Sequence, residues 1–136
     1  MLMICWPLDA CHYDGIEQVN FHIVFDQDAR TKANALAKKI GLRTGMKVFY
    51  REPADAAAGG AIEIYDSGVS IDILSVPCDP VEGRPSPRFS EHGYFVTIGE
   101  KDRTGGQKGL KDLADLVKKE TVSLGGRIAS SAPSCG

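Results

Sequence analysis

Three residues of the types that carry out acid–base chemistry lie in stretches whose alternating sequence predicts β-strands: His22, Asp72 and Arg51. A histidine can serve as a general base, a carboxylate can orient its ring, and a cation such as Arg51 or Lys47 can hold an anionic group of a substrate. A lone histidine in a strand is more often an ordinary surface or core residue. A small enzyme or ligand-binding domain centred on His22 is therefore the alternative hypothesis for function.

Two carboxylates, those of Glu63 and Asp72, lie in the segment IEIYDSGVSIDI at 62–73. The segment predicts a β-hairpin with a turn at Ser67 and Gly68, and residues that pair across a hairpin share one face of the sheet. This turn sets Glu63 directly across from Asp72, whereas a longer turn would make the carboxylates diagonal neighbours on the same face. The shorter turn also predicts three further pairs: Ile62 with Ile73, Ile64 with Ile71 and Tyr65 with Ser70.

The charged residues fall into two opposite blocks, although the net charge is only −2. Seven basic residues and no acid lie between residues 29 and 51, and seven acids and no base lie between residues 52 and 83. The basic block comprises Arg30, Lys32, Lys38, Lys39, Arg43, Lys47 and Arg51, and the acidic block comprises Glu52, Asp55, Glu63, Asp66, Asp72, Asp79 and Glu82. Lys47 and Arg51 would offset the carboxylate repulsion on a shared face, although charge runs are commonly just solvated faces.

Other chemistries lack a matching motif. Cys5, Cys11 and His12 do not have the CxxC-type spacing of a structural zinc site, and Cys78 sits in the acidic block, which disfavours a reactive thiolate. The Gly-rich segment GEKDRTGGQKG at 99–109 fits neither of the common phosphate-binding patterns. We therefore expect no metal site and no cofactor.

Composition limits the partners and the cellular location expected of the protein. A pI near 5.9 and the lack of an aromatic RNA-binding signature argue against nucleic acid as a partner. No apolar run approaches the roughly 18 residues of a membrane helix, and the start MLMICWPL lacks a positively charged leader. We expect a cytoplasmic protein that does not engage a membrane, with free thiols at Cys5, Cys11, Cys78 and Cys135.

Hydrophobic periodicity predicts the elements. A first helix should carry its apolar residues on one face, with Asp26 or Asp28 as N-cap and a stop at Gly41; these residues are Ala29, Ala33, Leu36, Ala37 and Ile40. A second helix at about 108–124 should be supported by an Asp115–Lys119 pair. Besides the hairpin, strands are expected at 20–26, 46–52, 94–98 and 125–130, and the Pro-rich segment 77–93 should be irregular.

These elements predict an α+β domain, either ferredoxin-like or with a related antiparallel or mixed sheet, and with two helices packed on one face. An N-terminal arm would cover 1–18, the domain 19–131 and a flexible tail 132–136. One helix layer cannot cover both faces of a sheet. The other face would therefore carry apolar side chains that the N-terminal arm, a second copy of the chain or a partner must cover: Phe49, Tyr65, Leu74, Val76 and Phe95.

A face that mixes aromatic and charged residues is typical of an interface. We therefore expect a small intracellular binding or regulatory protein of the inhibitor or immunity type, without enzymatic activity, that uses the open sheet face and the acidic hairpin. Its partner would be a protein, with a basic surface suiting the acids, and the chain would form a homodimer. The residues expected to bind are Lys47, Phe49, Arg51, Glu63, Tyr65, Asp66, Asp72 and Phe95.

Overall fold

The computed structural model describes residues 18–51, 60–66, 68–77, 89–100 and 106–131. The elements follow the chain in the order β1 (Gln18–Val24), α2 (Ala29–Thr44), β2 (Lys47–Arg51), β3 (Ala61–Asp66), β4 (Val69–Pro77), β5 (Phe89–Glu100), α3 (Gly106–Ser123) and β6 (Arg127–Ala129). The six strands form one sheet in the order β2-β3-β4-β5-β1-β6, and every neighbouring pair is antiparallel.

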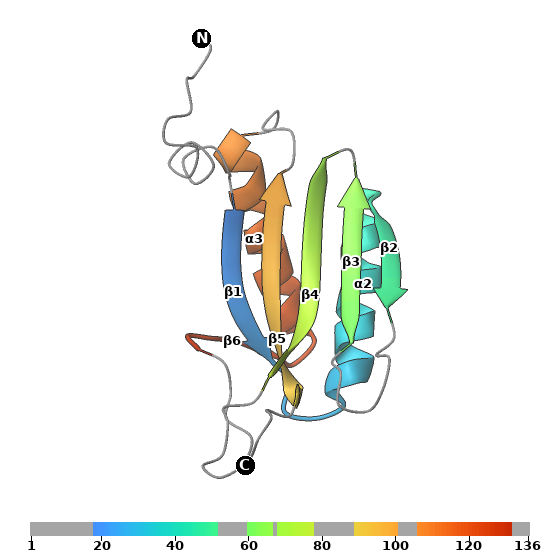
Figure 1. Ribbon diagram of the computed structural model, residues 1–136, viewed down its shortest axis with the longest axis vertical. Coiled ribbons are helices and arrows are strands. Elements are labelled where there is room, and N and C mark those ends of the chain that lie inside the picture. The colour runs from blue at the N-terminus through green and yellow to red at the C-terminus, as the bar shows by residue number, and fades with distance from the viewer. Residues whose placement is uncertain (1–17, 52–59, 67, 78–88, 101–105, 132–136) are drawn as a thin grey trace.

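Both helices lie on the same side of the sheet (Figure 1). Helix α3 packs behind β1 and β5, and α2 packs behind β2, β3 and β5. The α+β class is thus confirmed. The ferredoxin-like outline is not, because that fold alternates β-α-β-β-α-β, whereas here four consecutive strands run as a meander between the two helices.

The core lies between the helices and the strand positions that alternate toward them. Isoleucines dominate the sheet side, because branched side chains suit a pleated surface covered by helices. The fully buried residues include Ile23, Ile64, Ile71, Ile73, Val96 and Ile98 from the sheet and Leu36, Ile40, Leu110 and Val117 from the helices. Burial of these side chains, each contributing on the order of 1.5–3 kcal/mol, fixes which face of every strand points to the helices.

Helix α2 has the predicted buried stripe but does not end at Gly41. It begins after Asp28, which adopts a left-handed conformation and makes no side-chain capping bond, and it runs to Gly45, whose φ is 77°. Gly41 serves tertiary packing instead. A Cβ atom there would lie 2.7 Å from Cγ2 of Val48, so the glycine lets β2 pass close to the helix.

The β3–β4 hairpin has the predicted register in full. Glu63 pairs with Asp72, Ile62 with Ile73, Ile64 with Ile71 and Tyr65 with Ser70. Gly68, in the turn, has a φ of 92°, a value that few other residues adopt. The shorter of the two turns that the alternation allowed is therefore the one that forms.

Strand β5 is longer than predicted. It begins at Phe89, so part of the segment 77–93, which was expected to be irregular, belongs to the sheet. β5 pairs with β4 on one side and with the whole of β1 on the other. Backbone hydrogen bonds to two neighbours extend the strand beyond the hydrophobic run that predicted it.

Candidate functional site

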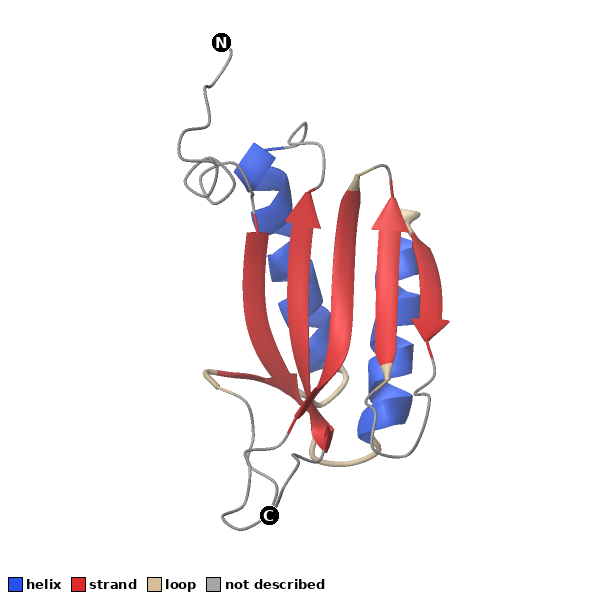
Figure 2. Ribbon diagram, in the orientation of Figure 1, coloured by secondary structure: helices blue, strands red, loops and turns tan. Residues whose placement is uncertain are grey.

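We call the side of the sheet away from the helices the outer face (Figure 2). By strand register, most of the charged and aromatic residues singled out from the sequence lie on this side. The strand register arranges them in rows across the sheet. The central row contains Phe49, Glu63, Asp72, Thr97 and Asn20, each directly opposite the next. One flanking row begins with Lys47, Tyr65 and Ser70, and the other contains Arg51, Ala61, Leu74, Phe95 and His22.

Val76, expected on the outer face, and Asp66, expected to bind as part of the acidic hairpin, are not exposed on that face. Asp66 ends β3 with the parity of Ile62 and Ile64, so it is exposed beside the turn on the helix side of the sheet. Val76 has the outward parity of Leu74 but is buried, and the β4–β5 register shifts between Ser75 and Pro77. Sequence alternation alone cannot reveal such a shift.

Two cations of β2, Lys47 and Arg51, lie close to the two carboxylates at the centre of the outer face. Glu63 is opposite both Phe49 and Asp72, which makes Lys47 and Arg51 its diagonal neighbours on β2. No ion pair among the described residues involves Lys47 or Arg51. Cations at these diagonal positions moderate the repulsion between the carboxylates.

A hollow of about 340 Å³ lies on the outer face over β2, β3 and β4. Phe49 and Leu74 supply apolar lining, and Arg51, Glu63 and Asp72 supply charge. Phe49 is 52% exposed and Leu74 is 40% exposed. Exposed apolar surface among charges of both signs is suited to binding another molecule.

The residues of the catalytic hypothesis do not come together. Arg51 and His22 occupy opposite ends of one row, four strand spacings or roughly 19 Å apart. Asp72 lies two strands from His22 and in a different row. The ring of His22 packs against Phe95 with centroids 5.0 Å apart, and its enclosed Nδ1 has no hydrogen-bonding partner among the described residues. This arrangement resembles side-chain packing more than a base with its orienting carboxylate.

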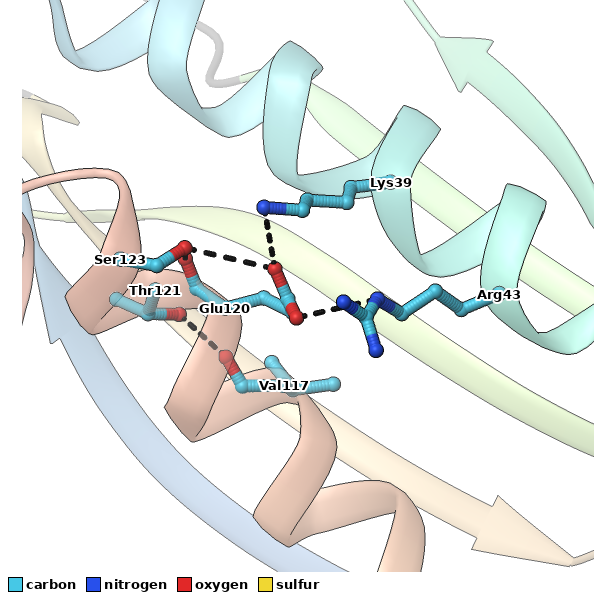
Figure 3. Close-up of polar contacts among 6 residues, drawn as sticks. All are labelled: Lys39, Arg43, Val117, Glu120, Thr121 and Ser123. Carbon is cyan, nitrogen blue, oxygen red and sulfur yellow. Dashed lines mark hydrogen bonds and ion pairs between the residues drawn. The ribbon is translucent and has the colours of Figure 1, made fainter.

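A cluster that the sequence analysis missed joins the two helices (Figure 3). The side chain of Glu120 on α3 is only 3% exposed, and its carboxylate lies 2.8 Å from Nζ of Lys39 and 3.2 Å from Nε of Arg43 on α2. The hydrogen bond from Lys39, with the charge of Arg43, lowers the pKa of Glu120 against the opposing effect of burial.

The available signal for this cluster was an acid on the apolar stripe of a predicted helix. Glu120 lies one turn beyond the buried Val117, where the stripe would otherwise continue with an apolar residue. The cluster connects helices on the far side of the sheet from the outer face and is structural. The predicted Asp115–Lys119 pair is not among the ion pairs of the described residues, and both side chains are exposed.

The remaining sequence-based expectations concern residues that fall largely outside the described ranges. Cys5, Cys11, Cys78 and Cys135 all do.

The helices that the structure describes include none long and apolar enough to cross a bilayer. Comparison of the sequence with protein-family models and with curated proteins found no match.

Proposed function

We propose that this protein is a non-enzymatic binding protein that holds a partner protein on the outer face of its sheet. The observation that carries the proposal is the contrast between the two faces. Inward-pointing Ile62 and Ile73 are buried beneath the helices, whereas the outward-pointing Phe49 and Leu74 are left half-exposed around the hollow. A partner that covered these side chains would remove apolar surface from water at about 25 cal/mol per Å².

The chemistry of the hollow favours a partner with a basic side chain. Lysine and arginine combine an apolar stem with a charged head. The stem would pack on Phe49 and Leu74, and the head would reach Glu63 and Asp72, whose mutual repulsion it would relieve. A domain that occupies a partner's surface in this way, in the cytoplasm, would act as a regulator of the inhibitor or immunity type.

The test compares partner capture by two charge-neutralised variants. Glu63→Gln/Asp72→Asn removes the two negative charges of the hollow, and the control Asp112→Asn/Asp115→Asn removes two exposed acids from α3. Proteins recovered from the native host lysate are quantified with each bait, and thermal melts check that all baits are folded. We expect capture of a basic protein to fall about tenfold with the first variant only.

Recovery of the same proteins in equal amounts by wild type and by both variants would show that the hollow is only a solvated part of the sheet. An equal loss of captured protein with both variants would show that capture depends on the net charge of the bait rather than on the outer face. Capture that weakens as ionic strength rises, for wild type and the control alike, would add support for electrostatic steering by Glu63 and Asp72.

A further inference from the structure

Strand β2 forms one edge of the sheet (Figure 1). It pairs with β3 on one side, and no described strand lies on its other side. Lys47, Phe49, Tyr50 and Arg51 are all exposed. The strand at the opposite edge, β6, spans three residues only. An open edge of five residues presents backbone donors and acceptors to which a further strand can bind.

The side chains of β2 determine which residue types would suit the paired positions of such a strand. Lys47, Phe49 and Arg51 point to the outer face, so an antiparallel neighbour would place its own outward residues directly opposite them. Acids opposite Lys47 and Arg51 would pair with cations that have no ion-pair partner among the described residues. An apolar residue would suit the position opposite Phe49, and apolar residues would also suit those opposite Val48 and Tyr50.

A second copy of the chain does not meet this requirement. Two β2 strands paired antiparallel about Phe49 would set each Lys47 across from an Arg51, and like charges directly opposite each other are destabilising. Basic residues on an edge commonly prevent self-pairing. On β2 the same residues also discriminate among foreign strands by charge.

We propose that β2 accepts an extended segment of a partner protein as an added antiparallel strand, and that this segment carries two acids four residues apart around three apolar residues. The inference shares Phe49 and Arg51 with the hollow but does not rest on the proposed function. It concerns the edge of the sheet and an acidic partner segment, whereas the hollow would receive a basic side chain through Glu63 and Asp72.

The test is fluorescence anisotropy with labelled peptides. The acidic probe is Ser-Glu-Val-Leu-Val-Glu-Ser, the basic probe replaces both Glu by Lys, and a third probe replaces the central Leu of the acidic peptide by Pro, which cannot join a sheet interior. We expect wild type to bind the acidic probe about tenfold more tightly than the basic one and to bind the proline probe weakly or not at all. Hydrogen exchange should slow at β2 amides and stay unchanged in α3.

The variants separate the edge from the hollow. Lys47→Glu/Arg51→Glu should reverse the preference toward the basic probe, and the milder Lys47→Gln/Arg51→Gln should abolish it. The control Lys38→Glu/Lys111→Glu, on exposed helix positions, should behave as wild type. Glu63→Gln/Asp72→Asn should keep the peptide preference even if it loses the partner of the hollow.

Three results would overturn the proposal. Equal affinity for the acidic and basic probes would remove the charge selectivity. Undiminished binding of the proline probe would exclude strand addition. Absence of binding by folded wild type at roughly millimolar peptide would mean that the cations of β2 serve only to block edge pairing.

Discussion

Glu120 shows how a single buried acid can connect two helices. Its carboxylate forms ion pairs with Lys39 and Arg43 of α2, and Oγ of Ser123 donates a hydrogen bond to it at 3.4 Å. Both cations remain about half exposed, so their hydration is largely retained while the acid is enclosed. The sequence contains these charges, but not the distance between the helices that makes them partners.

We predict that Glu120→Gln lowers the melting temperature at neutral pH and that this loss diminishes in acid. The folded-state pKa of Glu120 lies below its ordinary value of 4.5, so its charge stabilises the folded protein above that value. The stabilisation is lost as the pH falls through the lowered folded-state pKa, where wild type becomes protonated as well. Thermal melts of both proteins between pH 7 and about pH 3 measure the difference.

The matched control is Asp115→Asn, an exposed acid on the same helix, which should change the melting temperature little at any pH. A Glu120→Gln variant that melts like wild type at neutral pH, or whose deficit grows in acid, would contradict the assigned role.

At the scale of elements, close backbone approaches decide where turns and helix ends lie. The chain leaves α3 through Gly125, with a φ of 86°, and Gly126, whose N–H donates to the carbonyl of Thr121. A Cβ at Gly126 would lie 2.5 Å from Cε1 of Phe25, a fully buried ring. The turn into β6 therefore depends on the absence of a side chain at this position.

We predict that Gly126→Ala lowers the free energy of unfolding by about 1–3 kcal/mol, because the core ring of Phe25 must shift. Gly109→Ala is the control. A Cβ there would have no heavy atom within 4 Å, and alanine favours the helix by up to about 1 kcal/mol. Urea denaturation measures both variants, and a Gly126→Ala protein as stable as wild type would refute the steric argument.

Elements governed by local chemistry could be predicted, and those governed by tertiary contacts could not. Alternation and the turn specified the hairpin register, and this register places every predicted binding residue except Asp66 on the outer face. The predicted end of α2 was wrong because Gly41 lies inside the helix, where it leaves room for Val48, a residue outside the helix. Val76 was expected to be exposed but is buried, beside a register shift after Ser75 that sequence alternation does not encode.

At the scale of the whole molecule, both described helices cover the same side of the sheet. The order of the strands, with β1 between β5 and β6, has no local signal in the sequence, because it depends on contacts between the two ends of the domain. The separation of His22 from Arg51 follows from this order. The catalytic hypothesis therefore could not be judged before the topology was known.

We predict that, without a partner protein, the outer face supports a twofold dimer at high protein concentration, because association would cover Phe49 and Leu74. Light scattering during size-exclusion chromatography should give about twice the 14.6 kDa chain mass for wild type and one chain mass for Phe49→Glu. Leu42→Glu, at an exposed position on α2, should leave the dimer intact. A monomeric wild type would argue against self-association of this face.

The strand order also bears on how the protein is made. β1 precedes every other described element, yet its neighbours β5 and β6 are the last two strands of the sheet. Val24 of β1, for example, pairs with Arg127 of β6. A ribosome releases the chain from its N-terminus at about 5–20 residues per second, so β1 and the adjoining Phe25 emerge well before the strands that complete their surroundings. The meander from β2 to β5 can close first. Until then the nascent chain exposes the apolar side chains of β1, and chaperones would be expected to bind it.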